Sequence, residues 1–282
     1  ELFPQELKTE YGRLRKQFSG KTLLVTSDEP WIPWEMVKPV EYDADGNLLY
    51  ADPFLCEGFQ LARWLSGRGA PDRLSIEHGS LIVPPGDLAA SKDEIDLFAS
   101  LHRRNWNVSI GEQLSTVAGV TNQFKAGETQ LYHFACHGNF EPVDADGSKL
   151  RLTDGYLTPR SITGEKQAGL RRSKPLVFLN ACESGEGAFT LTRIGGWSQR
   201  FLDSGASAFI GTLWEVNDAL AARFATEFYG RLWGLNGGGQ KSLGCAFREA
   251  RLAVKAADPG NPTWLAYVLY GDPQATFSLG RR

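Results

Sequence analysis

Two short apolar runs in this chain each end at a residue that could take part in catalysis. The run 131–138 ends at His137 and Gly138, and the run 176–182 ends at Cys182. Apolar runs of this length without internal charge are typical of strands buried on both faces of a parallel sheet. In open α/β sheets the reactive groups follow the carboxyl ends of the strands. The spacing therefore predicts that a histidine and a cysteine meet at one edge of a sheet.

A cysteine beside a histidine forms a nucleophilic pair. The thiolate is the attacking form of cysteine, and a neighbouring imidazole can accept the thiol proton and return it to a leaving amine. We expect Cys182 to be the nucleophile and His137 the general base and acid. Backbone N–H groups near Gly138 and Cys182 are expected to form the oxyanion hole. This chemistry needs no cofactor and no metal. His133, deeper on the same strand, is expected to pack in the core.

The elements that must position these residues form an alternating pattern from about residue 80 onward. Strand-like runs alternate with helical ones, which indicates an α/β fold with a mostly parallel sheet. Besides the strands that end at His137 and Cys182, the expected strands are 81–83, 106–110, 207–214 and 266–270, the last of which should close the sheet. Four helices are expected. The first begins at Ser91, where Glu94 would complete a capping box, and the others cover 115–125, 218–233 and 243–257.

The first 79 residues have a less regular pattern. A strand is expected at 22–26, and the turn residues 43–47 predict a hairpin tip between two short strands. We interpret residues 1–79 as an N-terminal extension that packs on a domain spanning residues 80–282. The sequence starts without methionine, and we expect it to be a fragment of a larger protein.

Composition and charge exclude several classes of function. The 282 residues carry 30 basic and 33 acidic side chains, a net charge of −3. This balance gives no electrostatic footprint for nucleic acid or an anionic membrane. No signal peptide or membrane-spanning run is evident. The four cysteines, at positions 56, 136, 182 and 245, lack the spacing of disulfides or metal sites. A reducing, cytoplasmic location is expected.

The residues around the two catalytic candidates also carry a family resemblance. His-Phe-Ala-Cys-His-Gly at 133–138 and Leu-Asn-Ala-Cys-Glu-Ser-Gly at 179–185 resemble the CHAT family of caspase-like cysteine peptidases. Further similar blocks follow the family order over roughly the second half of the chain: 152–158, 205–218 (also similar to separases), 224–229 and 264–271. The resemblance implies a caspase-like sheet of about six strands with helices on both faces. It also allows residues 1–79 to be a degenerate pseudo-caspase part.

The same resemblance implies a cysteine endopeptidase that acts on protein substrates. Its activity is expected to be gated by a regulatory partner protein or a fused sensor domain, in a bacterial defence or regulatory pathway. The long polar segment 140–174 is a candidate lid, activation loop or autocleavage site. Two alternatives stay open. One is a catalytically silent module whose cleft docks a partner peptide, and the other is an amidase or transpeptidase that uses the same dyad.

Four residues are candidates for substrate binding by resemblance to caspase-like enzymes and separases. Asn180, two positions before the nucleophile, is expected to line the primary pocket. Glu215 and Asp218, after the strand 207–214, would suit a basic substrate side chain, although Asp218 is also placed to cap the next helix. Asp154 would orient a loop or contribute to the pocket. The two acidic residues, Glu215 and Asp218, predict cleavage after Arg or Lys.

Overall fold

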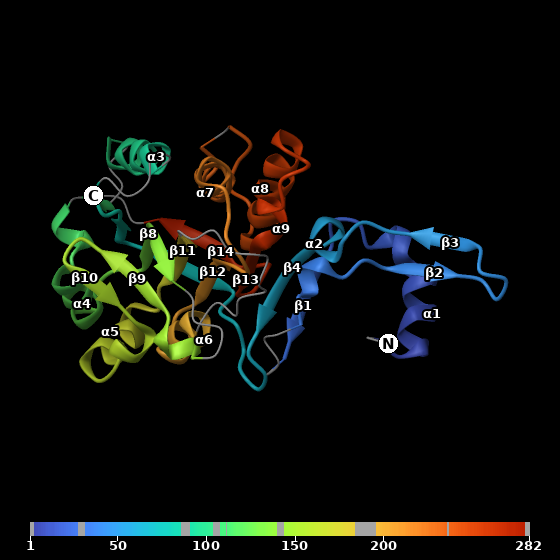
Figure 1. Ribbon diagram of the computed structural model, residues 1–282, viewed down its shortest axis with the longest axis horizontal. Coiled ribbons are helices and arrows are strands. Elements are labelled where there is room, and N and C mark those ends of the chain that lie inside the picture. The colour runs from blue at the N-terminus through green and yellow to red at the C-terminus, as the bar shows by residue number, and fades with distance from the viewer. Residues whose placement is uncertain are drawn as a thin grey trace.

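The computed structural model describes residues 3–27, 32–85, 91–103, 108–110, 112–139, 144–183, 196–235 and 237–279. Within these residues, ten strands form one large sheet in the order β1-β4-β13-β12-β11-β8-β6-β7, which β9 and β10 continue from β8 (Figure 1). Their bounds are β1 Thr22–Thr26, β4 Gln60–Trp64, β6 Gly79–Ile82, β7 Val108–Ile110, β8 Leu131–Asn139, β9 Lys149–Leu152, β10 Gly155–Leu157, β11 Leu176–Glu183, β12 Ala208–Thr212 and β13 Tyr267–Tyr270.

Two small sheets and a set of helices complete the described fold. The small sheets pair β2 (Val40–Tyr42) with β3 (Leu48–Ala51), and β5 (Arg73–Ile76) with β14 (Thr276–Leu279). The helices are α1 Gln5–Leu14, α2 Leu55–Gly58, α3 Ser91–Arg103, α4 Val117–Ala126, α5 Glu165–Ser173, α6 Trp197–Asp203, α7 Asp218–Leu232, α8 Leu243–Ala257 and α9 Thr263–Ala266. None of the helices in these residues has the length and apolar character needed to cross a membrane.

Strand direction divides the sheet into two halves. β7, β6, β8, β11 and β12 run parallel to one another. β13 runs antiparallel to β12, whereas β4 and β1 run parallel to β13. The carboxyl ends of β8, β11 and β12 therefore lie at one edge of the sheet, and those of β13, β4 and β1 lie at the opposite edge.

Helices cover both faces of the sheet, as the sequence predicted (Figure 1). On one face, Phe98 of α3 and Tyr229 of α7 pack against His133 of β8. On the other face, Phe124 of α4 packs edge-on against Tyr132, the next residue along β8. Because side chains alternate along a strand, β8 and β11 contribute to both layers of the core.

The sheet is larger than the predicted six strands. The prediction that 266–270 closes it is wrong, because β4 and β1 continue the sheet beyond β13. Both of these strands come from the first 79 residues, so the sheet crosses the predicted boundary between residues 79 and 80. β4 was missed because Arg63 interrupts an otherwise apolar run. In the fold Arg63 is buried and pairs with the equally buried Glu35.

The segment 140–174 also contains more structure than predicted. Among its described residues are β9, β10 and α5. Leu150, Leu152 and Leu157 are buried in the core, while Lys149 and Arg151 are exposed. The segment is therefore not one continuous loop, and its role as a lid, activation loop or autocleavage site stays a prediction. Residues 140–143 lie outside the described part of the chain.

The predicted hairpin is confirmed and lies far from the main body. β2 and β3 pair antiparallel, and the Asp43 carboxylate accepts the N–H groups of Asp45 and Asn47 at the tip. The hairpin and α1 project beyond β1, at the side of the sheet away from β8 (Figure 1).

Candidate active site

His137 and Cys182 occupy paired positions on neighbouring strands. β8 and β11 run parallel, and their register places Cys182 beside His137 and Glu183 beside Gly138. Hydrogen-bonded strands lie about 4.8 Å apart. The fold therefore brings the backbones of the two predicted residues together at the carboxyl ends of two central strands. The side chains of Cys182 and Glu183, and residues 184–195, lie outside the described part.

The surroundings of β8 change at His137. The strand is fully buried from Leu131 to Cys136, and His137 is the first residue that is partly exposed. Gly138 follows within the sheet, between Glu183 of β11 and Leu150 of β9. The imidazole thus stands where the apolar core ends, which is the position expected for a group that meets substrate.

Asn180 lies one step below Cys182 along β11. Its side chain is 3% exposed. Its Nδ2 donates to Glu94 Oε1 at 2.7 Å, and its Oδ1 accepts from the Tyr267 hydroxyl at 2.8 Å. Both ends of this amide are therefore bonded to interior groups. A role for Asn180 in the primary pocket stays a prediction.

Glu215 and Asp218 are exposed and follow the carboxyl end of β12. Because β12 is the parallel neighbour of β11, both residues come from the connection that leaves the same sheet edge as Cys182. The cap of α7 is the neighbouring Asn217, whose side chain accepts from the Leu220 N–H. Asp218 is thus the first residue of the helix and not its cap.

Asp154 is bonded to the backbone of another element. Its Oδ1 accepts from the N–H of Val117, the first residue of α4, at 2.6 Å. The carboxylate therefore ties the β9–β10 turn to a helix N-terminus, where a negative charge is favourable. This contact supports the loop-orienting role over the pocket role.

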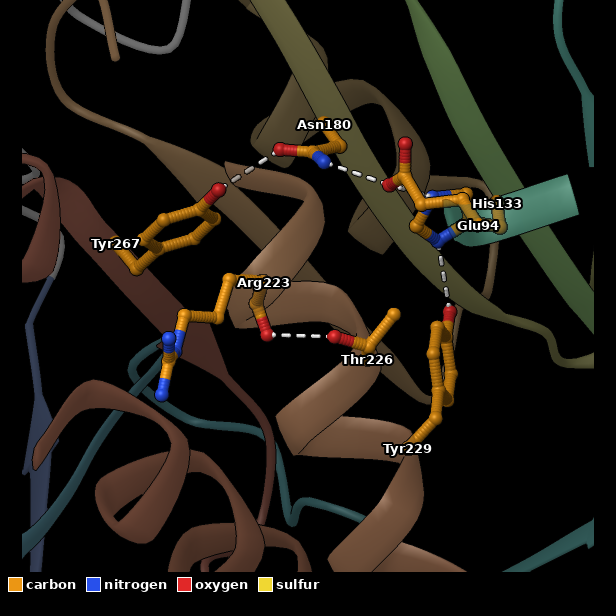
Figure 2. A network of polar contacts seen from close by, with 7 residues as sticks. All are labelled: Glu94, His133, Asn180, Arg223, Thr226, Tyr229 and Tyr267. Carbon is orange, nitrogen blue, oxygen red and sulfur yellow. Dashed lines mark hydrogen bonds and ion pairs between the residues drawn. The ribbon is translucent and has the colours of Figure 1, made fainter. Parts of the chain in front are cut away.

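A polar network that the sequence did not predict lies on the α3 and α7 face of the sheet (Figure 2). Glu94 Oε1 lies 2.8 Å from His133 Nε2, and His133 Nδ1 lies 3.0 Å from the Tyr229 hydroxyl. With the bonds of Asn180, these contacts connect five buried residues, which we call the buried network: Glu94, His133, Asn180, Tyr229 and Tyr267.

One signal for the buried network was present in the sequence. Glu94 shares a helical stripe with Phe98 and Leu101, both fully buried, so a carboxylate lies on the apolar face of α3. The predicted capping box directed attention to the helix end instead. In the fold the Glu94 carboxylate turns into the core, and the side chain of Ser91 lies outside the described residues. His133 is buried, as predicted, but it is hydrogen-bonded as well as packed.

The three cysteines with described side chains, Cys56, Cys136 and Cys245, form no disulfide. Burial raises the pKa of Cys56 to about 11. Burial and the Glu249 carboxylate raise the pKa of Cys245. Cys136 is fully buried in the core. Among the described residues, no cluster of three or more His, Cys, Asp or Glu side chains is arranged to hold a metal ion.

Comparison with known proteins places this arrangement in a family. The family model of the CHAT domain matches residues 17–272. Among curated proteins, none is similar enough to this sequence to count as a relative.

Solved structures share the fold at low sequence identity. Gingipain R, an Arg-specific cysteine proteinase, aligns with a TM-score of 0.57 at 14% identity, covering 96% of this chain and 67% of that chain. A complex of the pro- and mature domains of a Porphyromonas gingivalis gingipain aligns with a TM-score of 0.52 at 14% identity, covering 96% and 68%. Separase, from the Saccharomyces cerevisiae separase–securin complex, aligns with a TM-score of 0.53 at 17% identity, covering 92% of this chain but 16% of the separase chain.

At these identities the structural likeness establishes the fold, which is that of the caspase-like cysteine peptidases. The family match spans nearly the whole chain, including the strands from its first 79 residues. The chain therefore belongs to the CHAT domain family.

Proposed function

We propose that this chain is a cysteine endopeptidase in which Cys182 attacks the peptide bond and His137 moves the proton. The observation that carries the proposal is the register of β8 and β11, which pairs the two residues at the carboxyl ends of adjacent parallel strands. Active sites of α/β sheets lie at such strand ends. The caspase-like fold gives independent support.

The reaction needs only these side chains, backbone amides and water. His137 accepts the thiol proton, and the Cys182 thiolate attacks the carbonyl carbon to form a tetrahedral oxyanion. Backbone N–H groups near Gly138 and Cys182 stabilise this oxyanion. The intermediate then expels the amine, which takes the proton from the imidazolium and leaves a thioester. Water, deprotonated by His137, hydrolyses the thioester and restores the thiol.

We further propose that the primary pocket prefers Arg or Lys. Glu215 and Asp218 are exposed acidic residues after the strand next to β11. A carboxylate at this edge would pair with a basic substrate side chain. A protein with the same fold, gingipain R, is Arg-specific. Gating by a partner protein or a fused sensor domain, and a role in bacterial defence, stay predictions from the family resemblance.

A peptide library tests the catalytic proposal. The wild-type chain, Cys182→Ala and His137→Ala are each incubated with proteome-derived peptides, and new termini are mapped by mass spectrometry. We expect cleavage by the wild type and a loss of at least about a thousandfold in both variants, because neither residue works without the other. Cuts that persist in Cys182→Ala would sink the proposal.

A second experiment tests the pocket. Glu215→Gln and Asp218→Asn are compared with the wild type on matched peptides that carry Arg, Lys or Asn before the scissile bond. Loss of the paired carboxylate should lower kcat/KM for the basic peptides by about tenfold or more and leave the Asn peptide unchanged. Equal losses on all three peptides would contradict a charge-selective pocket.

A further inference from the structure

The buried network occupies the layer directly below the two dyad positions. Asn180 is two residues before Cys182 on β11, and its register partner on β8, Ala135, is two residues before His137. His133 is one further step down β8. Two residues along a strand correspond to about 6.6 Å. The network therefore begins two residues before the dyad on the same two strands, at the next side-chain position on the same face of the sheet.

Each member of the network has a partner, and the partners come from separate elements. Glu94 belongs to α3, His133 to β8, Asn180 to β11, Tyr229 to α7 and Tyr267 to β13 (Figure 2). A carboxylate only accepts hydrogen bonds, so Glu94 Oε1 receives those of Asn180 and His133. Burial, and then the charge of Glu94, raises the pKa of Tyr229, which therefore stays a phenol. Tyr267 stacks on Phe224 with 3.7 Å between the ring centroids.

Packing alone does not explain this arrangement. Glu94 is 2% exposed and His133 is fully buried, between the rings of Phe98 and Phe178. Burying a carboxylate is costly, and an apolar replacement of similar shape often stabilises a core. Hydrogen bonds, unlike apolar contacts, fix the direction and spacing of the groups that they join. The network thus fixes the positions of two helices relative to the two catalytic strands.

We propose that Glu94, His133 and Asn180 are positioning residues for the Cys182–His137 dyad, an inference that rests on the proposed peptidase function. The side-chain amide of Asn180 is hydrogen-bonded at both ends, and it thereby fixes the backbone of β11 two residues before Cys182. His133 does the same for β8. Glu94 joins the two strands by accepting from both, and Tyr229 and Tyr267 hold the outer ends of the network.

Two network variants and one matched control test this proposal. Glu94→Gln keeps the shape of the side chain and removes its charge. Tyr267→Phe removes only the hydroxyl that donates to Asn180. The control is Phe134→Leu, a fully buried residue of β8 that packs against Tyr132 and Phe201 on the face of the sheet opposite to the network, so that the change affects packing away from the network. Each protein is assayed for unfolding by urea, for kcat and KM, and for the rate of Cys182 alkylation by iodoacetamide between pH 5 and 9.

If the network positions the dyad, both network variants should lower kcat by about tenfold with little change in KM, because small displacements of reacting groups slow chemistry strongly. They should also change the alkylation profile of Cys182. Phe134→Leu should be destabilised to a similar extent and keep both the wild-type kcat and the wild-type profile. If Glu94→Gln fails to fold, Tyr267→Phe decides the question.

Two results would overturn the proposal in distinguishable ways. If the wild-type Cys182 alkylates no faster than an ordinary thiol and the chain cleaves nothing, the peptidase function fails and the positioning role fails with it. If Cys182 is fast in the wild type and equally fast in both network variants, with unchanged kcat, the dyad stands and the positioning role alone is wrong. Losses of kcat that match those of Phe134→Leu would have the same meaning.

Discussion

Among the residues that the structure describes, two carboxylates are buried, and their partners differ. Glu35 pairs with Arg63 of β4, in the half of the sheet built from the N-terminal strands. Glu94 bonds to His133 and Asn180, in the half that carries the dyad. The first is a close pair between two segments. The second is part of a chain of hydrogen bonds through five elements.

This difference separates stability from positioning. Arginine stays charged at every pH at which the protein is folded. The Glu35–Arg63 ion pair is therefore permanent, and it holds residues 34–36 against β4. The Glu94 carboxylate bonds instead to side chains of both central strands, and one of them, Asn180, lies two residues before Cys182. Burial of a charge is therefore not a sign of function by itself. Its place relative to the reactive strand ends is more informative.

The largest expected effect comes from breaking the Glu35–Arg63 ion pair. Arg63→Ala leaves the Glu35 carboxylate buried and uncompensated, which should lower the free energy of unfolding by about 3–5 kcal/mol. Urea titration measures this loss, and the double variant Arg63→Met, Glu35→Leu should recover much of it. The alkylation profile of Cys182 should be unchanged while the protein is folded. A shifted profile would erase the distinction between the two carboxylates.

The next largest effect concerns the reactivity of two thiols, Cys56 near the Glu35–Arg63 pair and Cys182 on β11. Burial raises the pKa of the Cys56 thiol to about 11, and the nearby charge of Glu35 contributes to this rise. Relative to an unperturbed thiol at 9.0, its thiolate fraction at pH 8 falls about a hundredfold. Iodoacetamide followed by peptide mapping should therefore label Cys182 first and Cys56 far more slowly. Similar rates at the two sites would argue against an activated Cys182.

The smallest effect concerns Asp154, which was a pocket candidate. Asp154→Asn removes a charge from the N-terminus of α4 and should cost about 0.5–1 kcal/mol. Thr116→Ala, which removes the side-chain cap of the same helix, serves as a matched control of about 1 kcal/mol. Both variants should keep the wild-type kcat and KM. A raised KM for basic peptides in Asp154→Asn alone would return this residue to the pocket.

The regular elements could be predicted because their patterns are local. The helix expected at 243–257 matches α8, and the one expected at 218–233 matches α7 within one residue. The two strand ends that carry His137 and Cys182 were found for the same reason. β4 was missed because its charge is neutralised by Glu35, 28 residues earlier in the chain.

The buried network could not be derived from local patterns. Its bonds join residues that are 39 to 96 positions apart. Glu94 fits a capping motif, and His133 fits an apolar run, so each has a sufficient local explanation. What distinguishes them is that the fold brings Glu94 to both His133 and Asn180, which only the strand order and the packing of α3 reveal.

The antiparallel placement of β13 has a practical consequence for work on this protein. Because β4 runs opposite to β11, the turn after β4 emerges at the sheet edge away from the dyad. Residues 66–69 in this turn are exposed, and a side chain added at Gly69 would meet nothing within 4 Å. An affinity tag or a fluorescent reporter inserted there would leave the edge that carries His137 and Cys182 open to long polypeptides. The turn after β4 is thus a suitable site for immobilising this protein in a search for its substrates.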